Sequence, residues 1–229
     1  MNGKKSNISF GTICVTVGIL ALISAAALWL YNDLEDRRAA NYSNAMAKDL
    51  IEIINNGNPA DLGFHGSHRS ESAEATLSFL NYDFDDTEDS DEPRAPAYIF
   101  IDDTAYIGVL SIPSLSLSLP INNTWSYPAL RNTPCRFSGF VEDNNIVLAA
   151  HNYTRHFGGI SSLEYGDAVI FTDVTGAEIH YYVVAHEVVQ PSHTALVMYS
   201  QYDLTLFTCN FDGTARVVLR CNRVDVSEQ

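Results

Sequence analysis

The chain has 229 residues and carries 13 Lys and Arg against 28 Asp and Glu, a formal net charge of −15. A nucleic-acid-binding protein needs a basic footprint to neutralise phosphates, so this balance excludes nucleic acid as a partner. The length allows one folded domain plus additional segments, and a hydrophobic content of 46% is enough to form its core.

The N-terminal segment is apolar, and residues 6–32 contain no charged side chain. About 20 apolar residues cross a bilayer as a helix, and residues 13–31 meet that length. Trp29 and Tyr31 stand at one end of the run, and Lys4 and Lys5 lie before the other. Aromatic rings favour the membrane interface and positive charge stays cytoplasmic, so we expect a single-pass cell-membrane anchor with a cytoplasmic N-terminus and an extracellular body.

A cleaved signal peptide is the alternative interpretation of this segment, since residues 25–27 are three alanines suited to cleavage. The apolar run continues beyond them through residues 28–30, which makes it longer than the apolar region of most signal peptides. Either interpretation predicts that the rest of the chain is exported.

Residues 33–55 repeat apolar side chains near helical spacing, and Gly57 and Pro59 end the pattern. Residues 56–96 are polar, with a run of acidic residues over 83–92. This run lacks the ligand order and glycine of an EF-hand, so we expect a solvated linker and no metal or cofactor. The predicted organisation is a cytoplasmic tip and anchor (1–32), a juxtamembrane helix and acidic linker (33–96), and a folded domain (97–229).

From residue 97 onward, short β-branched and aromatic runs alternate with Gly, Pro, Asn and Asp turns. Closely spaced strands of this kind predict a mainly β sandwich or barrel with few helices. The expected strands cover residues 106–113, 115–119, 145–150, 167–171, 179–185, 203–208 and 215–221.

Cys14 lies in the apolar run, and the other three cysteines, Cys135, Cys209 and Cys221, form no CxxC motif. Zinc binding or a thioredoxin-type site is therefore not indicated. Three cysteines cannot all pair within one chain, so at least one free thiol stands in an exported domain, where disulfides are favoured. Catalysis and simple burial both explain a free thiol, and pairing of Cys135 with Cys221 stays open.

Cys209 ends a predicted strand, and Asp212-Gly213 follows as a two-residue hairpin signal. A turn centred there places Cys209 opposite Arg216, with Cβ atoms about 5 Å apart on one face of the sheet. Arg220 falls on the same face but further along, opposite Thr205. A guanidinium beside a thiol favours the thiolate and can hold a developing oxyanion.

A cysteine nucleophile also needs a partner for proton transfer. His151 follows the predicted strand 145–150 directly, so it can project from a strand end into a cleft. A structural histidine is the alternative for such a position. His156 lies beside two glycines, and we expect it on the surface or in loop packing.

Four segments resemble the sortase family in order and spacing, over about residues 97–224. Thr205-Leu-Phe-Thr-Cys209 matches the family's TLxTC signature, and Asn145-Ile-Val-Leu-Ala-Ala-His-Asn-Tyr153 is similar to the segment that carries its histidine. The Arg-Val-Val run at 216–218 looks like the family arginine, and Tyr106-Ile-Gly-Val-Leu-Ser-Ile-Pro113 is similar to the opening strand. Ala150 departs from the glycine usual before the histidine. Residues 134–139 and 151–158 look closest to class B-type sortases.

The resemblance implies an eight-stranded β-barrel and a cysteine transpeptidase of the Gram-positive cell surface. Cys209 would attack the carbonyl after a threonine in a C-terminal sorting signal and form a thioacyl-enzyme. An amine of a cell-wall precursor or pilin subunit would then resolve it. His151 would act as general acid and base, Arg216 would stabilise the oxyanion, and Thr208 would help position the substrate.

Two other functions compete with this interpretation. An exported cysteine peptidase of another type is one, although papain-like enzymes place Cys before His and lead the cysteine into a helix. A non-catalytic surface domain is the other, and it would not need Cys209, His151 and Arg216 together.

Overall fold

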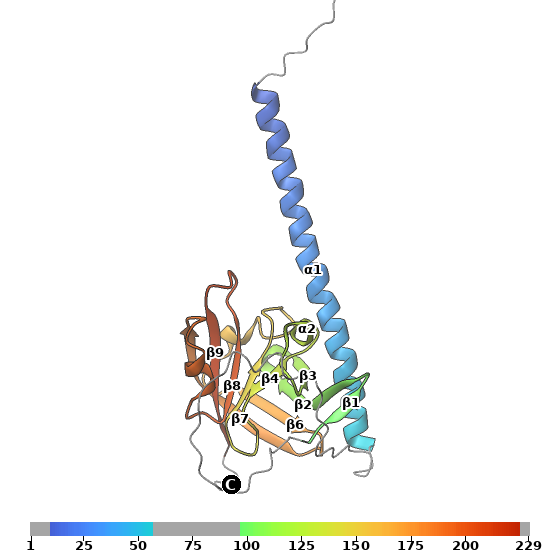
Figure 1. Ribbon diagram of the computed structural model, residues 1–229, viewed down its shortest axis with the longest axis vertical. Helices are drawn as coiled ribbons and strands as arrows, with labels where there is room; N and C mark the ends of the chain where they lie inside the picture. The colour runs from blue at the N-terminus through green and yellow to red at the C-terminus, as the bar shows by residue number, and fades with distance from the viewer. Residues whose placement is uncertain (1–9, 57–96, 225–229) are drawn as a thin grey trace, which may run out of the picture.

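A long N-terminal helix and a β-barrel make up the part of the chain that the computed structural model describes, residues 10–56 and 97–224 (Figure 1). The expected acidic linker lies outside these residues. Helix α1 (Phe10–Asn56) has 47 residues. The apolar span and the juxtamembrane helix, expected as separate segments, form one continuous helix, because no proline interrupts the sequence between them. The helix ends at Asn56, where the sequence predicted its stop.

Nine strands form one sheet in the order β1-β2-β3-β4-β5-β8-β9-β7-β6, and an additional pairing of β2 with β6 closes it. Strands β2 to β9 therefore form the expected eight-stranded barrel, and the short β1 lies beside β2. The strands are β1 (Ile99–Ile101), β2 (Thr104–Ile112), β3 (Leu117–Asn122), β4 (Cys135–Ser138), β5 (Ile146–Ala149), β6 (Ala168–Asp173), β7 (Glu178–Val189), β8 (Leu204–Cys209) and β9 (Arg216–Arg223).

The other described elements are short helices in the barrel's connections. They are η3 (Pro113–Leu115), α2 (Tyr127–Leu130), η4 (Ile160–Ser162) and α3 (Thr194–Met198). Ser126 caps α2, since its hydroxyl accepts a hydrogen bond from the Ala129 amide.

Alternation along the strands divides the inside of the barrel from its outer surface. On β8, Leu204 and Leu206 are fully buried in the main core, together with Leu219 of β9. Phe207 and Cys209 have the opposite parity and point outward. The outer surface is not all solvated, because Val218 and Val197 pack over it in a second apolar cluster.

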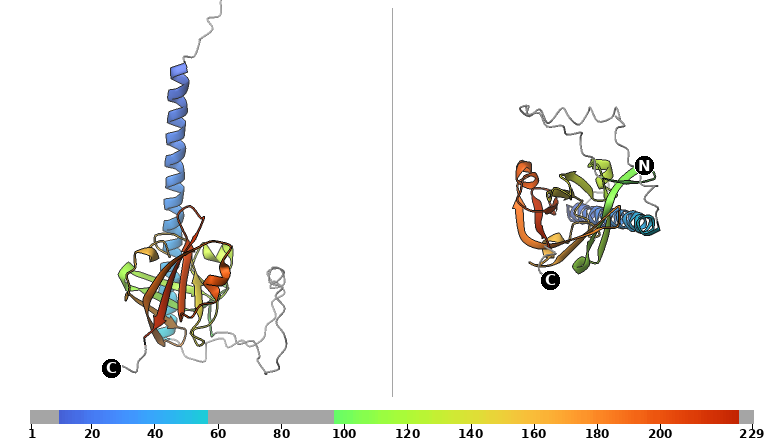
Figure 2. Two further views of the ribbon diagram at one scale, coloured as in Figure 1. Left: turned by 90° about the vertical axis from the view of Figure 1, so that its left-hand side faces the viewer. Right: turned by 90° about the horizontal axis from the view of Figure 1, so that it is seen from below.

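The C-terminal half of α1 packs against one flank of the barrel (Figure 2). Leu50 is fully buried in a cluster with Tyr106 and Val109, and such a side chain contributes about 2 kcal/mol when buried. Small residues, Ala39 and Ala47 among them, are buried along the same side of the helix and allow close approach. The helix is therefore fixed to the barrel rather than joined to it by a flexible stalk.

The N-terminal half of α1 projects beyond the barrel, and its large apolar side chains are exposed from Ile13 to Tyr31. By length and composition this is one helix that could cross a membrane. Such a segment is compatible with a membrane anchor or with a signal sequence.

Candidate active site at the ends of β5 and β8

His151 and Cys209 are brought together by two parallel strands that end at the same edge of the barrel. Strand β5 pairs with β8 in the register Ile146 to Leu204 through Ala149 to Phe207. The Ala150 amide continues this ladder with a 3.2 Å hydrogen bond to the Phe207 carbonyl. Two steps beyond Ala149 and Phe207, this register would place His151 beside Cys209, and neighbouring strands are about 4.8 Å apart.

The two chain segments beyond these residues are also joined. The Asn152 side-chain amide donates to the Asn210 carbonyl over 3.3 Å, directly after the histidine and the cysteine. Cys209 and His151 are both half-buried, so each is fixed by its strand end yet open to a ligand.

Arg216 lies opposite Cys209 in the β8–β9 hairpin, as the sequence predicted. The turn itself differs from the prediction. The Gly213 amide bonds to the Asn210 carbonyl, which centres the turn on Phe211 and Asp212, and Gly213 follows with φ +74°. Glycine is suited to that left-handed conformation, so the loop is longer than two residues while the register is unchanged.

The register separates three arginines of β9. Arg216 is half-buried, and its guanidinium donates to the Ala215 carbonyl over 3.3 Å. Arg220 is opposite Thr205, is only 2% exposed, and donates to Glu187 over 2.8 Å and to the Thr205 hydroxyl over 2.9 Å. Arg223 has the other parity and donates to the Asn144 side chain. Only Arg216 combines a position beside Cys209 with an accessible guanidinium.

His151 lies in an environment that favours the neutral imidazole. Burial, and then the positive charge of Arg131, lowers its pKa below the ordinary value. Its ring lies 4.9 Å from that of Tyr153, centroid to centroid. A neutral imidazole can accept a proton near neutral pH, which suits a partner for a thiol.

His156 packs within its loop, which is the second of the two positions that the sequence analysis allowed for it. It is not a surface residue: it is fully buried, 5.4 Å from the Tyr153 ring, and neither ring nitrogen has a hydrogen-bond partner among the described residues. Burial, and then the charge of His151, lowers its pKa to about 4. Asp36 of α1 acts on it in the opposite direction. The loop 151–156 thus connects the site to α1. The one sequence signal for the burial of His156 was the apolar Phe157 that follows it.

Thr208, just before Cys209, is buried, and its hydroxyl donates to the Ala150 carbonyl over 2.8 Å. That bond joins β8 to β5 immediately before both Cys209 and His151. Any contribution of Thr208 to substrate positioning is therefore indirect, through the alignment of the two strand ends.

An apolar strip, formed by Trp125, Phe137 and Phe207, adjoins Cys209 on the outer surface of the barrel. The three half-buried rings contact one another edge to face, with centroids 5.6 and 5.1 Å apart. Phe207 shares the parity of Cys209, so the alternation of β8 could have identified it. Trp125 and Phe137 come from other segments, and nothing in the local sequence places them here.

The four cysteines are all free. Cys135 and Cys221 are buried, in different clusters, so they do not form the disulfide that the sequence left open. Burial raises the pKa of each of these two thiols to about 12. Cys209 is the one thiol of the barrel that reaches solvent.

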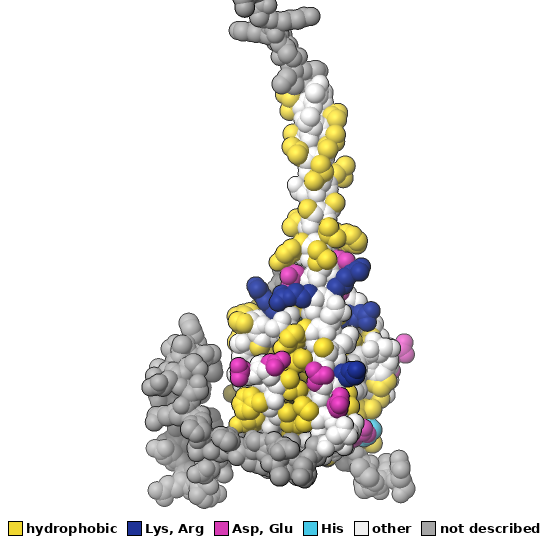
Figure 3. Space-filling view, turned by 90° about the vertical axis from the view of Figure 1, so that its right-hand side faces the viewer, with side chains coloured by type: hydrophobic (Ala, Val, Ile, Leu, Met, Phe, Trp, Pro, Cys, Tyr) yellow, Lys and Arg dark blue, Asp and Glu magenta, His cyan; other side chains and the backbone are white. Residues whose placement is uncertain are grey.

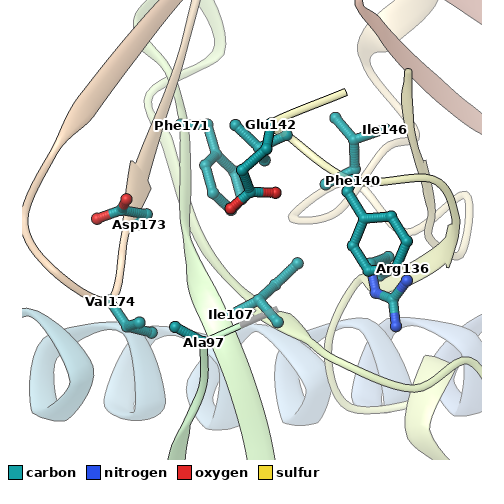
Figure 4. A pocket seen from close by; sticks show the side chains of 10 residues that line it. Ala97, Ile107, Arg136, Phe140, Glu142, Ile146, Phe171, Asp173 and Val174 are labelled. Carbon is teal, nitrogen blue, oxygen red and sulfur yellow. The ribbon is translucent and has the colours of Figure 1, made fainter. Parts of the chain in front are cut away.

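A cavity at the opposite end of the barrel does not form part of this site (Figure 4). It includes Ile146, the first residue of β5, together with Arg136, Glu142 and Asp173, and its volume is about 30 Å³. Arg136 there donates to the Gly139 carbonyl and to Asn123. The cavity has room for about one water molecule, so it cannot hold a peptide.

A closed barrel that carries a thiol, an imidazole and a guanidinium at adjoining strand ends is the architecture of a thiol-dependent enzyme. A family model described as Sortase domain matches residues 110–224, half of the chain. The chain therefore belongs to the sortase family, a family of cysteine transpeptidases.

Several solved structures are similar to the chain. A Sortase D5 transpeptidase from Clostridium perfringens is 22% identical, with a TM-score of 0.48 over 52% of this chain and 79% of that chain. Sortase A from Corynebacterium diphtheriae, in a lid mutant, is 22% identical, with a TM-score of 0.48 over 81% of this chain and 97% of that chain. Sortase E1 from Streptomyces coelicolor is 21% identical, with a TM-score of 0.47 over 52% and 88%.

The comparison with curated proteins found no match. The three solved structures named above are of classes D, A and E, so they give no specific support to the expected likeness to class B.

Proposed function

We propose that the protein cleaves a C-terminal sorting signal of exported proteins and joins the new carboxyl end to an amine of a cell-wall precursor or pilin subunit. The observation that carries this proposal is the pairing of Cys209 with Arg216 on one side and with the His151 strand end on the other. Membership of the sortase family disfavours both alternatives, an unrelated cysteine peptidase and a non-catalytic surface domain.

In the proposed reaction, His151 takes the proton of the Cys209 thiol, and the sulfur attacks the carbonyl carbon of the scissile peptide bond. Arg216 stabilises the resulting oxyanion, and the C–N bond breaks as His151 gives a proton to the leaving amine. The thioacyl-enzyme is then attacked by the acceptor amine, which loses a proton to His151, and the Cys209 sulfur leaves and takes that proton back from His151. No metal or cofactor takes part.

The apolar strip of Trp125, Phe137 and Phe207 supports an extended peptide as the substrate. It runs along the same outer surface as Cys209 and offers half-buried rings to apolar side chains of the peptide. Neutral, partly apolar recognition also suits a protein whose net charge is strongly negative.

We also propose that the apolar half of α1 is a single-pass membrane anchor with a cytoplasmic N-terminus. Residues 97–229 would form the catalytic domain, to which the 33–56 half of α1 is packed. The likeness to class B-type sortases remains a proposal that rests on residues 134–139 and 151–158 alone.

The proposed function is tested by incubating the full chain with a library of C-terminal sorting-signal peptides and an amine acceptor. We expect a ligated product with the wild type and none with Cys209→Ala, because alanine has no nucleophilic atom. Cys14→Ala is the matched control, since it removes an exposed thiol far from the site and leaves ligation unchanged. Ligation by the Cys209→Ala variant would contradict the nucleophile assignment.

A further inference from the structure

The end of the barrel that carries the candidate site lies level with the point where the apolar part of α1 stops. Tyr153, in the loop after His151, is within electrostatic reach of Tyr31 and Glu35 of α1. The β8–β9 hairpin points in the same direction as the apolar half of α1 (Figure 1). The site therefore faces the surface of any membrane that this helix crosses.

The helix sets the height of that surface. Residues 13–31 span about 27 Å at 1.5 Å per residue, close to the thickness of the bilayer's hydrocarbon core. Arg37 and Arg38 follow about 10 Å beyond Tyr31, at the outer edge of the headgroup layer. Basic side chains gather at this level, where the apolar shaft of α1 meets the barrel (Figure 3).

Two further arginines stand on either side of α1 at this level. Arg155 shares one surface hollow with Arg37 and Asp36, and Arg131 shares another with Arg38 and Tyr127. Both Arg131 and Arg155 are exposed, and neither forms an ion pair with a described residue.

The acidic groups of this level are largely engaged already. Arg37 pairs with Asp33 at 2.9 Å, and Arg38 contacts Glu35 at 3.6 Å. Asp36 has a buried carboxylate oxygen without a hydrogen-bond partner among the described residues, so it is the acidic group at this level that is not engaged. The unpaired positive charge is thus that of Arg131 and Arg155, on a chain whose net charge is −15.

Exposed aromatic side chains accompany these arginines. Phe211 at the tip of the hairpin is fully exposed, and Tyr127 of α2 is 72% exposed. Aromatic rings at the headgroup level, together with Arg side chains, are features of surfaces that rest on a membrane.

Building on the proposed anchor, we infer that the site-bearing end of the barrel docks on an anionic membrane surface, where Arg131 and Arg155 bind lipid phosphates and Phe211 enters the interface. The docked barrel holds Cys209 at the bilayer surface, so its peptide and amine substrates must be presented there. Each arginine near an anionic surface contributes about fivefold to membrane affinity.

The test is hydrogen–deuterium exchange of the full chain in lipid nanodiscs, either of pure phosphatidylcholine or with added phosphatidylglycerol. We expect residues 126–132 and 210–214 to exchange more slowly in the anionic discs. Arg131→Gln and Arg155→Gln should each lower this protection about fivefold. Lys48→Gln is the control, because Lys48 is an exposed cation of α1 that lies about 15 Å beyond Arg38 along the helix, away from the proposed bilayer.

Equal exchange in the two kinds of disc, or an equal loss of protection in Lys48→Gln, would overturn the docking proposal. Co-elution of the chain with the discs tests the anchor separately. A chain that co-elutes but shows no protection contradicts docking alone, and a chain that does not co-elute contradicts both docking and the anchor. Neither result bears on ligation by Cys209, which is measured with soluble peptides.

Discussion

The open end of the β8–β9 pair and its middle differ in what surrounds an arginine. At the open end, Arg216 lies opposite Cys209, and the hydrogen bond described for its guanidinium is to its own neighbour, Ala215. In the middle, Arg220 has the same parity but is bound by Glu187, Thr205 and the Leu196 carbonyl of α3, and lies 5.6 Å from the Tyr202 ring. Position on the strand decides whether an arginine on this face is accessible beside Cys209, as the proposed catalysis needs, or is buried in structural contacts.

The largest expected effect is on kcat, which replacement of Arg216 should lower far more than replacement of Arg220. Arg216→Ala should lower kcat by about 100- to 1000-fold, the usual cost of losing one oxyanion donor, and Arg216→Lys should lose most of kcat because lysine lacks the planar fork. Arg220→Ala should cost far less in kcat per folded molecule. Steady-state kinetics of the three variants, corrected for folded fraction by circular dichroism, checks this. A folded Arg220→Ala variant with a strongly lowered kcat, together with an active Arg216→Ala variant, would contradict this assignment.

Stability should show the opposite order, because Arg220→Ala should lower the free energy of unfolding more than Arg216→Ala does. Arg220→Ala leaves Glu187 without its cation and two carbonyls without their donor, and breaking a buried pair costs about 3–5 kcal/mol. Because Glu187 is partly exposed, at 37%, we expect the lower end of this range. Arg216→Ala should change the free energy of unfolding by about 0.5 kcal/mol or less. Urea denaturation measures both, and equal destabilisation would show that Arg216 is structural as well.

His156 links the open end to α1 and should make stability depend on pH. Its pKa of about 4 in the folded chain is below the 6.5 of the unfolded chain, so the unfolded state binds more protons between these values. Stability is therefore complete above pH 6.5 and falls by about 3 kcal/mol as pH drops to 4. Denaturation at several pH values should show a flatter dependence in His156→Gln. The exposed His180→Gln is the control, and an unchanged slope in His156→Gln would contradict the assignment.

Thr208 tests whether the two strand ends must be held in register. Thr208→Val keeps the shape and removes the hydrogen bond to the Ala150 carbonyl, which costs about 1 kcal/mol of stability. We expect kcat to fall about tenfold, less than the 100-fold that a misplacement of 1 Å can cause, with little change in KM. If KM rises and kcat is unchanged, the residue contributes to peptide binding instead.

The smallest effect concerns the charge near His151. Arg131→Gln removes a positive charge that disfavours the imidazolium, so the pKa of His151 should rise, although burial still holds it below the ordinary value. An NMR titration of the His151 ring protons measures this shift. Arg136→Gln, on β4 beside the cavity at the opposite end of the barrel, should leave the titration unchanged. A downward shift in Arg131→Gln would mean that the charge does not act on His151 as described.

Much of this arrangement could be predicted from strand alternation. The parity of β8 and β9 placed Cys209 and Thr205 opposite Arg216 and Arg220, and the longer turn at Gly213 did not alter that register. Both Asn210 and Ala215 still face each other through a backbone bond, from the Asn210 amide to the Ala215 carbonyl.

Other features depend on contacts between distant segments and have no local signal. The buried His156 lies near enough to α1 for Asp36 to act on its pKa. The apolar strip requires Trp125 and Phe137 to meet Phe207 across three segments. Strand β1 was missed because it has three residues, and β4 was missed because Cys135–Ser138 contains Arg and Ser and lacks the apolar run of the equally short β5. The sequence also could not show that α1 is continuous from its apolar half to the barrel.

The central claim, that Cys209 forms a thioacyl-enzyme, is tested most directly by mass spectrometry of the full chain incubated with a sorting-signal peptide and no amine acceptor. After acid quenching and proteolysis, we expect the acyl part of the peptide attached to the fragment that contains Cys209. The other three cysteines should carry no acyl group, because Cys14 lies in the apolar helix and Cys135 and Cys221 are buried. Cleavage of the peptide with no adduct on Cys209, or with the adduct on another residue, would contradict the account.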